Sequence, residues 1–369
     1  MLSSLQIKNF RLFEELTLPQ VGQVNLIVGK NNSGKTCLLE ALRIFAGRGA
    51  GPVLHSLVEE RHEDFTVLSE QADEAPYFPE IQRNPLRSLF PGHEFPDSLD
   101  TKIEIGPLRP RSERFRLGLR AYSVTEYEDG LVRKPIKAST LREVANDAKL
   151  FLEGRADGSR TGPLIPLDGP FIKTGKERNE HARFVAASGW DGNTLTRRWA
   201  RVSIRPALRE HVISALKLVD PGIQELVLVP GPQRSSEFIV IHGEDERLPL
   251  KALDDGAGRL FQMVLATVVS KGGYVLLDEF ENGLHWSVQP QVWRLVFKLA
   301  EMLDLQVFAT THSWDCVRAF QEADAGSSVT GMLFHLGRSV RTSEYGKVIA
   351  TRYSGEDLSR ATRAGLEVR

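Results

Sequence analysis

The segment that most constrains the fold is a run of eight residues at positions 29–36, Gly-Lys-Asn-Asn-Ser-Gly-Lys-Thr. It fits the pattern G-x-x-x-x-G-K-[ST] at every position. The apolar stretch Gln23–Val28 comes directly before it, and a periodic stretch from Lys35 to about Phe45 follows it. A strand, a glycine turn and the start of a helix are the context in which this pattern forms a phosphate-binding loop. The motif therefore predicts an α/β fold with the loop at the end of a buried strand.

Each part of this loop has a chemical task. Its glycines let backbone N–H groups wrap phosphates, and the helix N-terminus favours negative charge. Lys35 reaches the β- and γ-phosphates, and the Thr36 hydroxyl is a ligand for Mg²⁺. A guanine-recognising N-K-x-D motif is absent from the sequence, which favours ATP over GTP. The residues expected to bind ATP are Gly29, Lys30, Asn31, Asn32, Ser33, Gly34, Lys35, Thr36 and Cys37. We expect the Cys37 side chain to pack in the core rather than to act in redox chemistry.

Two later segments end predicted strands in polar residues. Tyr274–Leu277 is apolar and leads into Asp278 and Glu279. A carboxylate at a strand end beside the phosphate loop can hold Mg²⁺, which assigns that ion to Thr36 and Asp278. Glu279 is expected to polarise the attacking water. A further strand of about 305–310 leads into His312, which we expect to donate a hydrogen bond to the γ-phosphate from the ligand side of a parallel sheet.

Composition excludes several other classes of protein. The chain has 47 basic and 48 acidic residues among 369, with 41% hydrophobic residues, which is ordinary for a globular protein. The net charge of −1 argues against a uniformly basic nucleic-acid binder, although a local basic patch is compatible with it. Two cysteines far apart in sequence make a disulfide scaffold or a cysteine zinc site improbable. With no apolar run long enough for a bilayer and no signal-peptide pattern, we expect a cytoplasmic protein without membrane contact.

The patterned segments fall into two blocks. Residues 1–50 and 236–369 alternate strands with helices, which predicts an ATPase core with a largely parallel sheet. Residues 51–235 contain most of the prolines and only short strand candidates, and we interpret them as an inserted α+β lobe. Proline at this density excludes a long coiled coil. The expected fold class is therefore α/β, with two sequence blocks forming one core.

A possible signature loop precedes the helix predicted from about Gly256. Asp254, Asp255 and Gly256 have two interpretations, which the sequence leaves open. They are either a helix cap followed by flexible glycines, or a loop that presents backbone N–H groups to the γ-phosphate held by a second subunit.

These elements, in this order, resemble the ATP-binding-cassette class of P-loop ATPases, and more closely its RecF, SMC and OLD-like branch. The opening Ile7-Lys8-Asn9-Phe10-Arg11 looks like the first strand of that branch. The stretch from Asp278 to His285, continuing to His312, looks like small stand-alone OLD-like ATPases. The resemblance covers residues 1–45 and about 238–369. We expect this chain to lack the C-terminal Toprim nuclease domain that full OLD proteins carry, and with it a nuclease activity.

The resemblance implies roles for the matching residues. Lys35 and Thr36 would form the Walker A pair, Asp278 the Walker B aspartate, Glu279 the catalytic base, and His312 the switch histidine. Asp254, Asp255 and Gly256 would be the signature loop acting in trans. A carboxylate at Asp254 is a departure from the Ser or Gly often found there, and Arg259 is a candidate to offset its charge. The D-loop at the dimer interface would contain Glu281, Asn282 and Gly283.

Arginines recur every four residues in the lobe, at Arg197, Arg201, Arg205 and Arg209. On a helix they would share one face, although Pro206 divides the stretch and makes two helices possible. The face is either solvated or paired with the acidic segment Ser56–Glu80, or it contacts a DNA backbone through Arg197, Arg201 and Arg205.

Two hypotheses for function follow. In the first, Mg²⁺-dependent ATP hydrolysis opens and closes a head-to-head homodimer, in DNA repair or phage defence, together with a separately encoded nuclease or other effector. In the second, ATP binding with negligible turnover gates the binding of DNA or of an effector protein. A transporter ATPase subunit is disfavoured, because its signature normally resembles LSGGQ.

Overall fold

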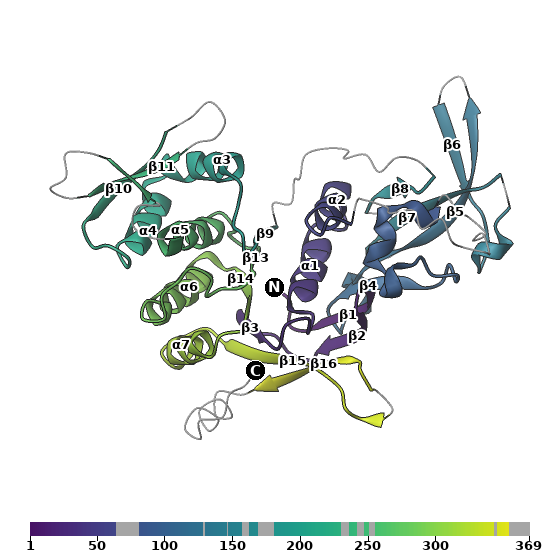
Figure 1. The fold of residues 1–369 in the computed structure, drawn as a ribbon. Helices are drawn as coiled ribbons and strands as arrows, with labels where there is room; N and C mark the ends of the chain where they lie inside the picture. Colours follow the sequence, from purple (N-terminus) through teal and green to yellow (C-terminus); the bar gives the residue numbers. More distant parts are fainter. Residues whose placement is uncertain are drawn as a thin grey trace.

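The computed structural model describes residues 1–63, 81–127, 130–145, 147–156, 162–168, 181–229, 236–241, 247–250, 255–342 and 345–353. The chain folds as a mixed α/β protein with one largely parallel sheet and one antiparallel sheet (Figure 1). No helix in the described ranges is long and apolar enough to cross a membrane.

The parallel sheet contains the strand that leads into the phosphate-binding loop. In spatial order its strands are β16 (Val348–Tyr353), β15 (Gly331–Arg338), β3 (Val24–Val28), β14 (Gln306–Thr311), β13 (Tyr274–Leu277) and β9 (Ala182–Val185). All neighbours pair in parallel except β16, which runs antiparallel at the edge. The register places Leu277 beside Ala309, and Thr311 beside Val28. The carboxyl ends of β3, β14 and β13 therefore meet at one edge, which is where ligands bind in sheets of this kind.

Helices cover both faces of this sheet. One face packs against α5 (Asp255–Val268), α6 (Gln289–Leu303) and α7 (Trp314–Ala325), and the other face packs against α1 (Lys35–Ala46), which α2 (Gly51–Glu59) follows (Figure 1). Side chains of β13 alternate between the two cores: Val275 and Leu277 pack in the first, and Leu276 packs in the second. This alternation is the period of two that a strand imposes, and burial on both faces explains the unbroken apolar run.

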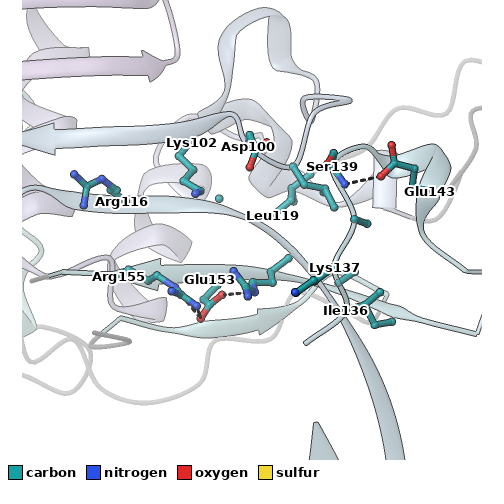
Figure 2. Close-up of a pocket in the computed structure, with 15 residues that line it drawn as sticks. Asp100, Lys102, Arg116, Leu119, Ile136, Lys137, Ser139, Glu143, Glu153 and Arg155 are labelled. Atoms are coloured by element: carbon teal, nitrogen blue, oxygen red, sulfur yellow. Dashed lines mark hydrogen bonds and ion pairs between the residues drawn. The ribbon is translucent and has the colours of Figure 1, made fainter. Parts of the chain in front are cut away.

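The antiparallel sheet lies beyond α1. Its strands, in spatial order, are β2 (Phe13–Leu18), β1 (Leu5–Phe10), β4 (Lys102–Gly106), β5 (Phe115–Tyr127), β7 (Lys149–Arg155) and β8 (Leu164–Pro166), with β6 (Gly130–Pro135) also pairing with β5. Ile103, Ile105 and Leu117 on one face pack in the same core as α1. The other face carries a hollow lined by charged side chains (Figure 2).

A small third sheet packs near α5. It contains β10 (Ile223–Val229), β11 (Ser236–Ile241) and β12 (Leu248–Pro249), with α3 (Gly192–Ser203) and α4 (Pro206–Leu216) beside it. The arginine stretch thus forms two helices, and Pro206 opens the second, a position where its missing N–H removes no helix hydrogen bond. Short 3₁₀ turns complete the described chain: η1 (Ile81–Arg83), η2 (Pro85–Leu89), η3 (Pro91–His93), η4 (Arg111–Glu113) and η5 (Leu141–Glu143).

The α/β fold class expected from the sequence is confirmed, and the strand pairing adds detail to the block of residues 51–235. This block shares its sheets with the flanking sequence: β4 pairs with β1, and β9 pairs with β13. The division into a core of 1–50 and 236–369 and a lobe of 51–235 stays a prediction about folding units.

Candidate active site at the phosphate-binding loop

The loop between β3 and α1 requires glycine at two positions. Gly29 has a φ of 151° and Gly34 a φ of 98°, both in the region that side chains disfavour. A Cβ on Gly29 would lie 2.4 Å from the carbonyl oxygen of Leu336, and one on Gly34 would lie 2.9 Å from the ring of Phe13. The backbone thus turns tightly into α1, and the first amides of the helix lie at the sheet edge.

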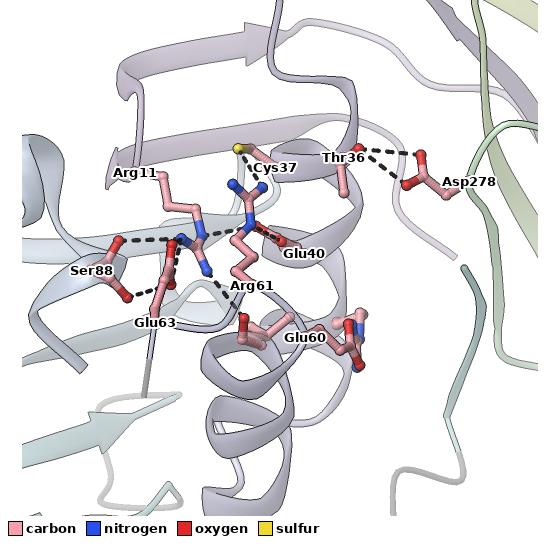
Figure 3. A network of polar contacts seen from close by, with 11 residues as sticks. Arg11, Thr36, Cys37, Glu40, Glu60, Arg61, Glu63, Ser88 and Asp278 are labelled. Carbon is pink, nitrogen blue, oxygen red and sulfur yellow. Dashed lines mark hydrogen bonds and ion pairs between the residues drawn. The ribbon is translucent and has the colours of Figure 1, made fainter. Parts of the chain in front are cut away.

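A buried ionic network anchors α1 to its surroundings (Figure 3). Glu40 of α1 accepts a hydrogen bond from Arg61 Nε at 2.7 Å, and its other carboxylate oxygen forms an ion pair with Arg11 Nε at 2.8 Å. Arg11 also pairs with Glu63 at 2.7 Å. Arg11 and Glu40 are each only 4% exposed at the side chain, so both charges need these partners. The network ties the helix that starts at the phosphate loop to the β1–β2 turn and to the segment after α2.

Cys37 belongs to the same region and packs as the sequence predicts. Its side chain is buried, and Arg61 Nη2 lies 3.2 Å from the sulfur. Burial raises the pKa of the Cys37 thiol to about 11. The thiol therefore stays protonated at neutral pH, which disfavours reaction as a nucleophile.

The Lys35 side chain folds back over the loop. Its ammonium donates to the carbonyl oxygens of Gly29 at 2.7 Å and Lys30 at 3.1 Å. Partial burial lowers the pKa of Lys35, and the nearby Asp278 and Glu281 carboxylates act against this shift. A partly desolvated cation faced by carboxylates can exchange these weak carbonyl contacts for phosphate oxygens.

Thr36 and Asp278 meet across the gap between α1 and the end of β13 (Figure 3). Thr36 Oγ1 donates to Asp278 Oδ2 at 3.1 Å, and Asp278 Oδ1 also accepts from Thr310 Oγ1 at 2.6 Å. Asp278 is 8% exposed. Its two hydroxyl partners fix the orientation of the carboxylate. The sequence does not predict this role for Thr310, which lies near the end of β14 and two residues before His312.

Glu279 has an unusual backbone conformation that its neighbours hold in place. Its φ is 49°, a value rare for residues other than glycine. Its N–H donates to Thr310 Oγ1 at 2.9 Å, and its carbonyl oxygen accepts from Arg259 Nη2 at 3.2 Å. The half-buried side chain follows directly from the Asp278 strand end. This kind of strained backbone at a sheet edge is typical of functional sites.

Arg259 contacts the end of β13, whereas the sequence suggested it as a partner for the Asp254 carboxylate. It is 6% exposed and donates to the backbone carbonyl oxygens of Asp278 and Ala186 as well as Glu279. Burial lowers the pKa of Arg259, while the surrounding carboxylates, Asp278 first, act against this shift. Its guanidinium thus holds the backbone just after β13 in place through hydrogen bonds. Asp254, whose charge Arg259 was considered to offset, lies outside the described residues.

His312 and Glu281 form a pair that sequence spacing alone does not predict. The backbone N–H of His312 donates to Glu281 Oε1 at 3.0 Å, and the same oxygen lies 3.2 Å from Nδ1 of the His312 ring. The imidazole is 55% exposed. In the same turn, the Asn282 amide donates to the Ala187 carbonyl at 2.9 Å, and Gly283 has a φ of 74°. The predicted D-loop therefore lies beside the predicted switch histidine.

The proposed signature loop lies largely beyond what the structure describes. Asp254 is outside the described residues, and Asp255 is the first residue of α5. Gly256 is buried in the first turn of that helix. Its participation in a shared site stays a prediction.

The side chains at this edge fit Mg²⁺ and a nucleotide. Hydroxyl and carboxylate oxygens 3.1 Å apart, from Thr36 and Asp278, are the hard ligands that Mg²⁺ prefers. The Ser33 hydroxyl is buried without a hydrogen-bond partner among the described residues, so the loop has an unused polar group. Over the same ranges, no cluster of three or more His, Cys, Asp or Glu side chains forms a metal site by itself. This fits Mg²⁺ held by one or two protein ligands together with phosphates.

The chain is similar in sequence to a nucleotide phosphatase and, over a shorter stretch, to a DNA replication and repair protein. An ATP/GTP phosphatase of Helicobacter pylori is 23% identical over 349 residues, covering 87% of this chain and 88% of that protein. A RecF DNA replication and repair protein of Pseudoalteromonas translucida is 41% identical over 73 residues, covering 19% of this chain and 20% of that protein. The alignment thus covers only about a fifth of the length of the RecF protein.

Solved SMC heads and a family model complete the comparison. An SMC head bound to the C-terminal winged-helix domain of ScpA aligns over 98% of this chain and 99% of that one, with 13% identity and a TM-score of 0.47. An SMC head domain from Thermotoga maritima has 14% identity and a TM-score of 0.42, over 96% of this chain and 99% of that one. The family model described as "AAA domain, putative AbiEii toxin, Type IV TA system" matches residues 24–315, from the strand before the loop to just past His312. The chain therefore belongs to this AAA-domain family and is a P-loop ATPase.

Proposed function

We propose that the chain hydrolyses ATP with Mg²⁺ at this sheet edge, and that the hydrolysis cycle opens and closes a head-to-head homodimer. The observation that carries the proposal is the convergence of Lys35, Thr36, Asp278 and Glu279 on one edge, from the ends of β3 and β13. Thr36 contacts Asp278 at 3.1 Å although 242 residues separate them. Such convergence is the geometry that phosphoryl transfer needs, because catalysis there is mostly positioning and charge stabilisation.

Each residue has a role in this proposal. Lys35 and the loop amides hold the phosphates, and Thr36 with Asp278 would hold Mg²⁺, which when bound neutralises charge on the phosphate oxygens. Glu279 orients the attacking water and accepts its proton. His312, with its exposed ring, donates toward the γ-phosphate. Thr310 and Arg259 are positioning residues, since they contact the Asp278 carboxylate and the backbone at Glu279 rather than substrate.

The dimer is proposed from the exposed groups around the loop. Asn282 and Gly283 are exposed beside the site, so a second copy of the chain could contact them directly. Asp254, Asp255 and Gly256 of the second copy would then complete the site around the γ-phosphate. In this arrangement ATP joins the two copies, and hydrolysis releases them.

The biological setting is proposed from the relatives' names. The matching family is described as a putative toxin of a type IV toxin–antitoxin system, and the RecF relative acts in DNA replication and repair. We propose a cytoplasmic role in phage defence or DNA repair, with a separately encoded nuclease or other effector as partner.

Steady-state phosphate release tests the proposal against the alternative of a nucleotide-gated switch. We expect Mg²⁺-dependent turnover of ATP that EDTA abolishes. Tight ATP binding with no turnover, in both the presence and the absence of duplex DNA, would instead support the switch.

Arg259→Gln should reduce turnover with little change in ATP affinity. Removing the guanidinium leaves the buried carbonyl oxygen of Asp278 without this donor and frees the strained turn at Glu279. A displacement of about 1 Å at a catalytic group costs on the order of 10²-fold in rate. Steady-state kinetics should therefore show a loss in kcat, while an ATP titration stays near wild type. Chemical denaturation of Arg259→Gln and Arg259→Lys controls for folding. Equal losses in kcat and in ATP affinity would contradict a role confined to Glu279.

The arginine face is expected to contact DNA if the protein binds DNA at all. Arg197, Arg201 and Arg205 are exposed, and none of them has an ion pair among the described residues. Reversing Arg197 and Arg201 to Glu should weaken DNA binding and reduce the slope of log K against log salt by about one per arginine. A matched control reverses Lys298 and Arg318, two exposed cations on α6 and α7. Equal effects of both double variants, or no salt-sensitive binding in the wild type, would exclude this face as the DNA contact.

A further inference from the structure

The outer face of the antiparallel sheet carries a pocket of about 350 Å³ (Figure 2). Its lining comes from β4, β5 and β7 and from the segments around 99–100 and 136–143. None of these residues belongs to the phosphate-binding loop site. The volume lies within the range of about 300–1,000 Å³ that is typical of small-molecule sites.

The strand register explains why this face is hollow. Lys102 of β4 and Glu153 of β7 both pair with Gly118 of β5, so the middle position of this three-strand row has no side chain. A Cβ on Gly118 would lie 2.7 Å from Lys102 Cγ. The glycine therefore leaves the floor of the pocket open between a cation on one side and a carboxylate on the other.

Cations outnumber acids in the lining. The positively charged side chains are Lys102, Arg116, Arg120, Lys137 and Arg155, and the negatively charged ones are Asp100, Glu143 and Glu153. Arg120 and Arg155 share the single carboxylate of Glu153, at 3.6 and 3.1 Å. Among the described residues, Lys102 and Lys137 have no ion pair. Arg116 pairs with Glu104 at 3.0 Å. The positive charge of the lining that has no ion pair in the described chain is therefore that of the two lysines.

Glu153 supplies a second, independent feature. It is 4% exposed, and its Oε2 accepts no hydrogen bond from the described residues. Figure 2 shows this side chain beside Arg155 at the pocket floor. This oxygen has an ion pair with Arg120 at 3.6 Å but no hydrogen-bond donor, so it favours a ligand that also presents an N–H or O–H group.

We propose that this pocket binds a phosphate-bearing ligand of nucleotide size. Its phosphate would lie between Lys102, Lys137 and the flanking arginines, because guanidinium and ammonium groups bind phosphate through charge-assisted hydrogen bonds. A hydroxyl or amino group of the same ligand would donate to Glu153. The phosphate belongs either to a free mononucleotide or to the 5′ end of a nucleic-acid strand.

Calorimetric titration of the Lys35→Ala variant, which removes the loop lysine that binds phosphates, tests the pocket. The probes are AMP with adenosine, and a short 5′-phosphorylated single strand with its 5′-hydroxyl twin. Tighter binding of AMP than of adenosine indicates a mononucleotide site. A preference for the phosphorylated strand, without AMP binding, indicates a strand end.

Three double variants on the same background separate the effect of the pocket from that of general charge. Replacing Lys102 and Lys137 with Ala should weaken the preferred phosphorylated probe by at least about tenfold, the loss expected for charge-assisted contacts. Replacing both with Arg should preserve binding. The control replaces Lys271 and Lys298, two exposed lysines outside the pocket, with Ala and should change nothing. The proposal is overturned if neither phosphorylated probe binds better than its unphosphorylated twin, or if the pocket and control variants bind alike.

Discussion

Lys35→Ala should lose measurable ATP binding. Lys35 is the partly buried cation at the start of α1, and its ammonium donates to the loop carbonyl oxygens of Gly29 and Lys30. Without it, the β- and γ-phosphates would lie near the Asp278, Glu279 and Glu281 carboxylates and lack the ammonium that is expected to contact them. Equilibrium titration with a fluorescent ATP analogue measures the loss.

The matched control for this prediction is Lys271→Ala. Lys271 is an exposed lysine between α5 and β13, so its removal changes the net charge equally and should leave ATP affinity as in the wild type. Unchanged ATP affinity in Lys35→Ala would mean that the loop is not the nucleotide site.

Glu279→Gln should bind ATP normally and hydrolyse it about 10²–10⁴-fold more slowly. The substitution keeps the shape of the side chain and the backbone contacts to Thr310 and Arg259, but it removes the group that accepts the proton from water. Thr36 and Asp278 keep their contact. Phosphate release measures the rate, and the titration used for Lys35→Ala measures affinity.

Glu301→Gln is the control for Glu279→Gln, because Glu301 is an exposed carboxylate on α6. It should hydrolyse ATP at the wild-type rate. A Glu279→Gln variant that also keeps that rate would show that Glu279 is not the base.

Local sequence patterns predict the elements around the site well. Strands Leu5–Phe10 and Tyr274–Leu277 have the bounds that the structure gives them, and α1 begins at Lys35 as expected. These segments combine a strong local signal with burial on both faces, so local propensity and tertiary packing agree.

Other parts of the fold depend on contacts between distant segments. β9 has only four residues, and its place beside β13 is fixed by pairing across about ninety residues of sequence. In the antiparallel sheet, the pairing of β4 with β1 and with β5 likewise depends on contacts that local sequence does not specify. No periodicity in residues 51–235 predicts which sheet each short strand joins.

The same limit applies to the site. The loop motif and the Asp278–Glu279 pair are visible in the sequence because their chemistry requires fixed spacing. The roles of Arg259 and Thr310 are not, because these side chains contact backbone carbonyl and N–H groups and the Asp278 carboxylate, 19 to 73 residues away. The Arg11–Glu40–Arg61 network likewise joins three segments whose charges look like surface residues in the sequence.

The oligomeric state of Glu279→Gln shows whether ATP joins two copies of this chain and hydrolysis separates them. The measurement is size-exclusion chromatography with light scattering, in ATP with Mg²⁺ and in ADP with Mg²⁺. We expect a dimer that persists in ATP and a monomer in ADP. Only ATP supplies the γ-phosphate that is proposed to link the loop of one copy to residues 254–256 of the other. A variant that stays monomeric in ATP, or is equally dimeric in ADP, would contradict it.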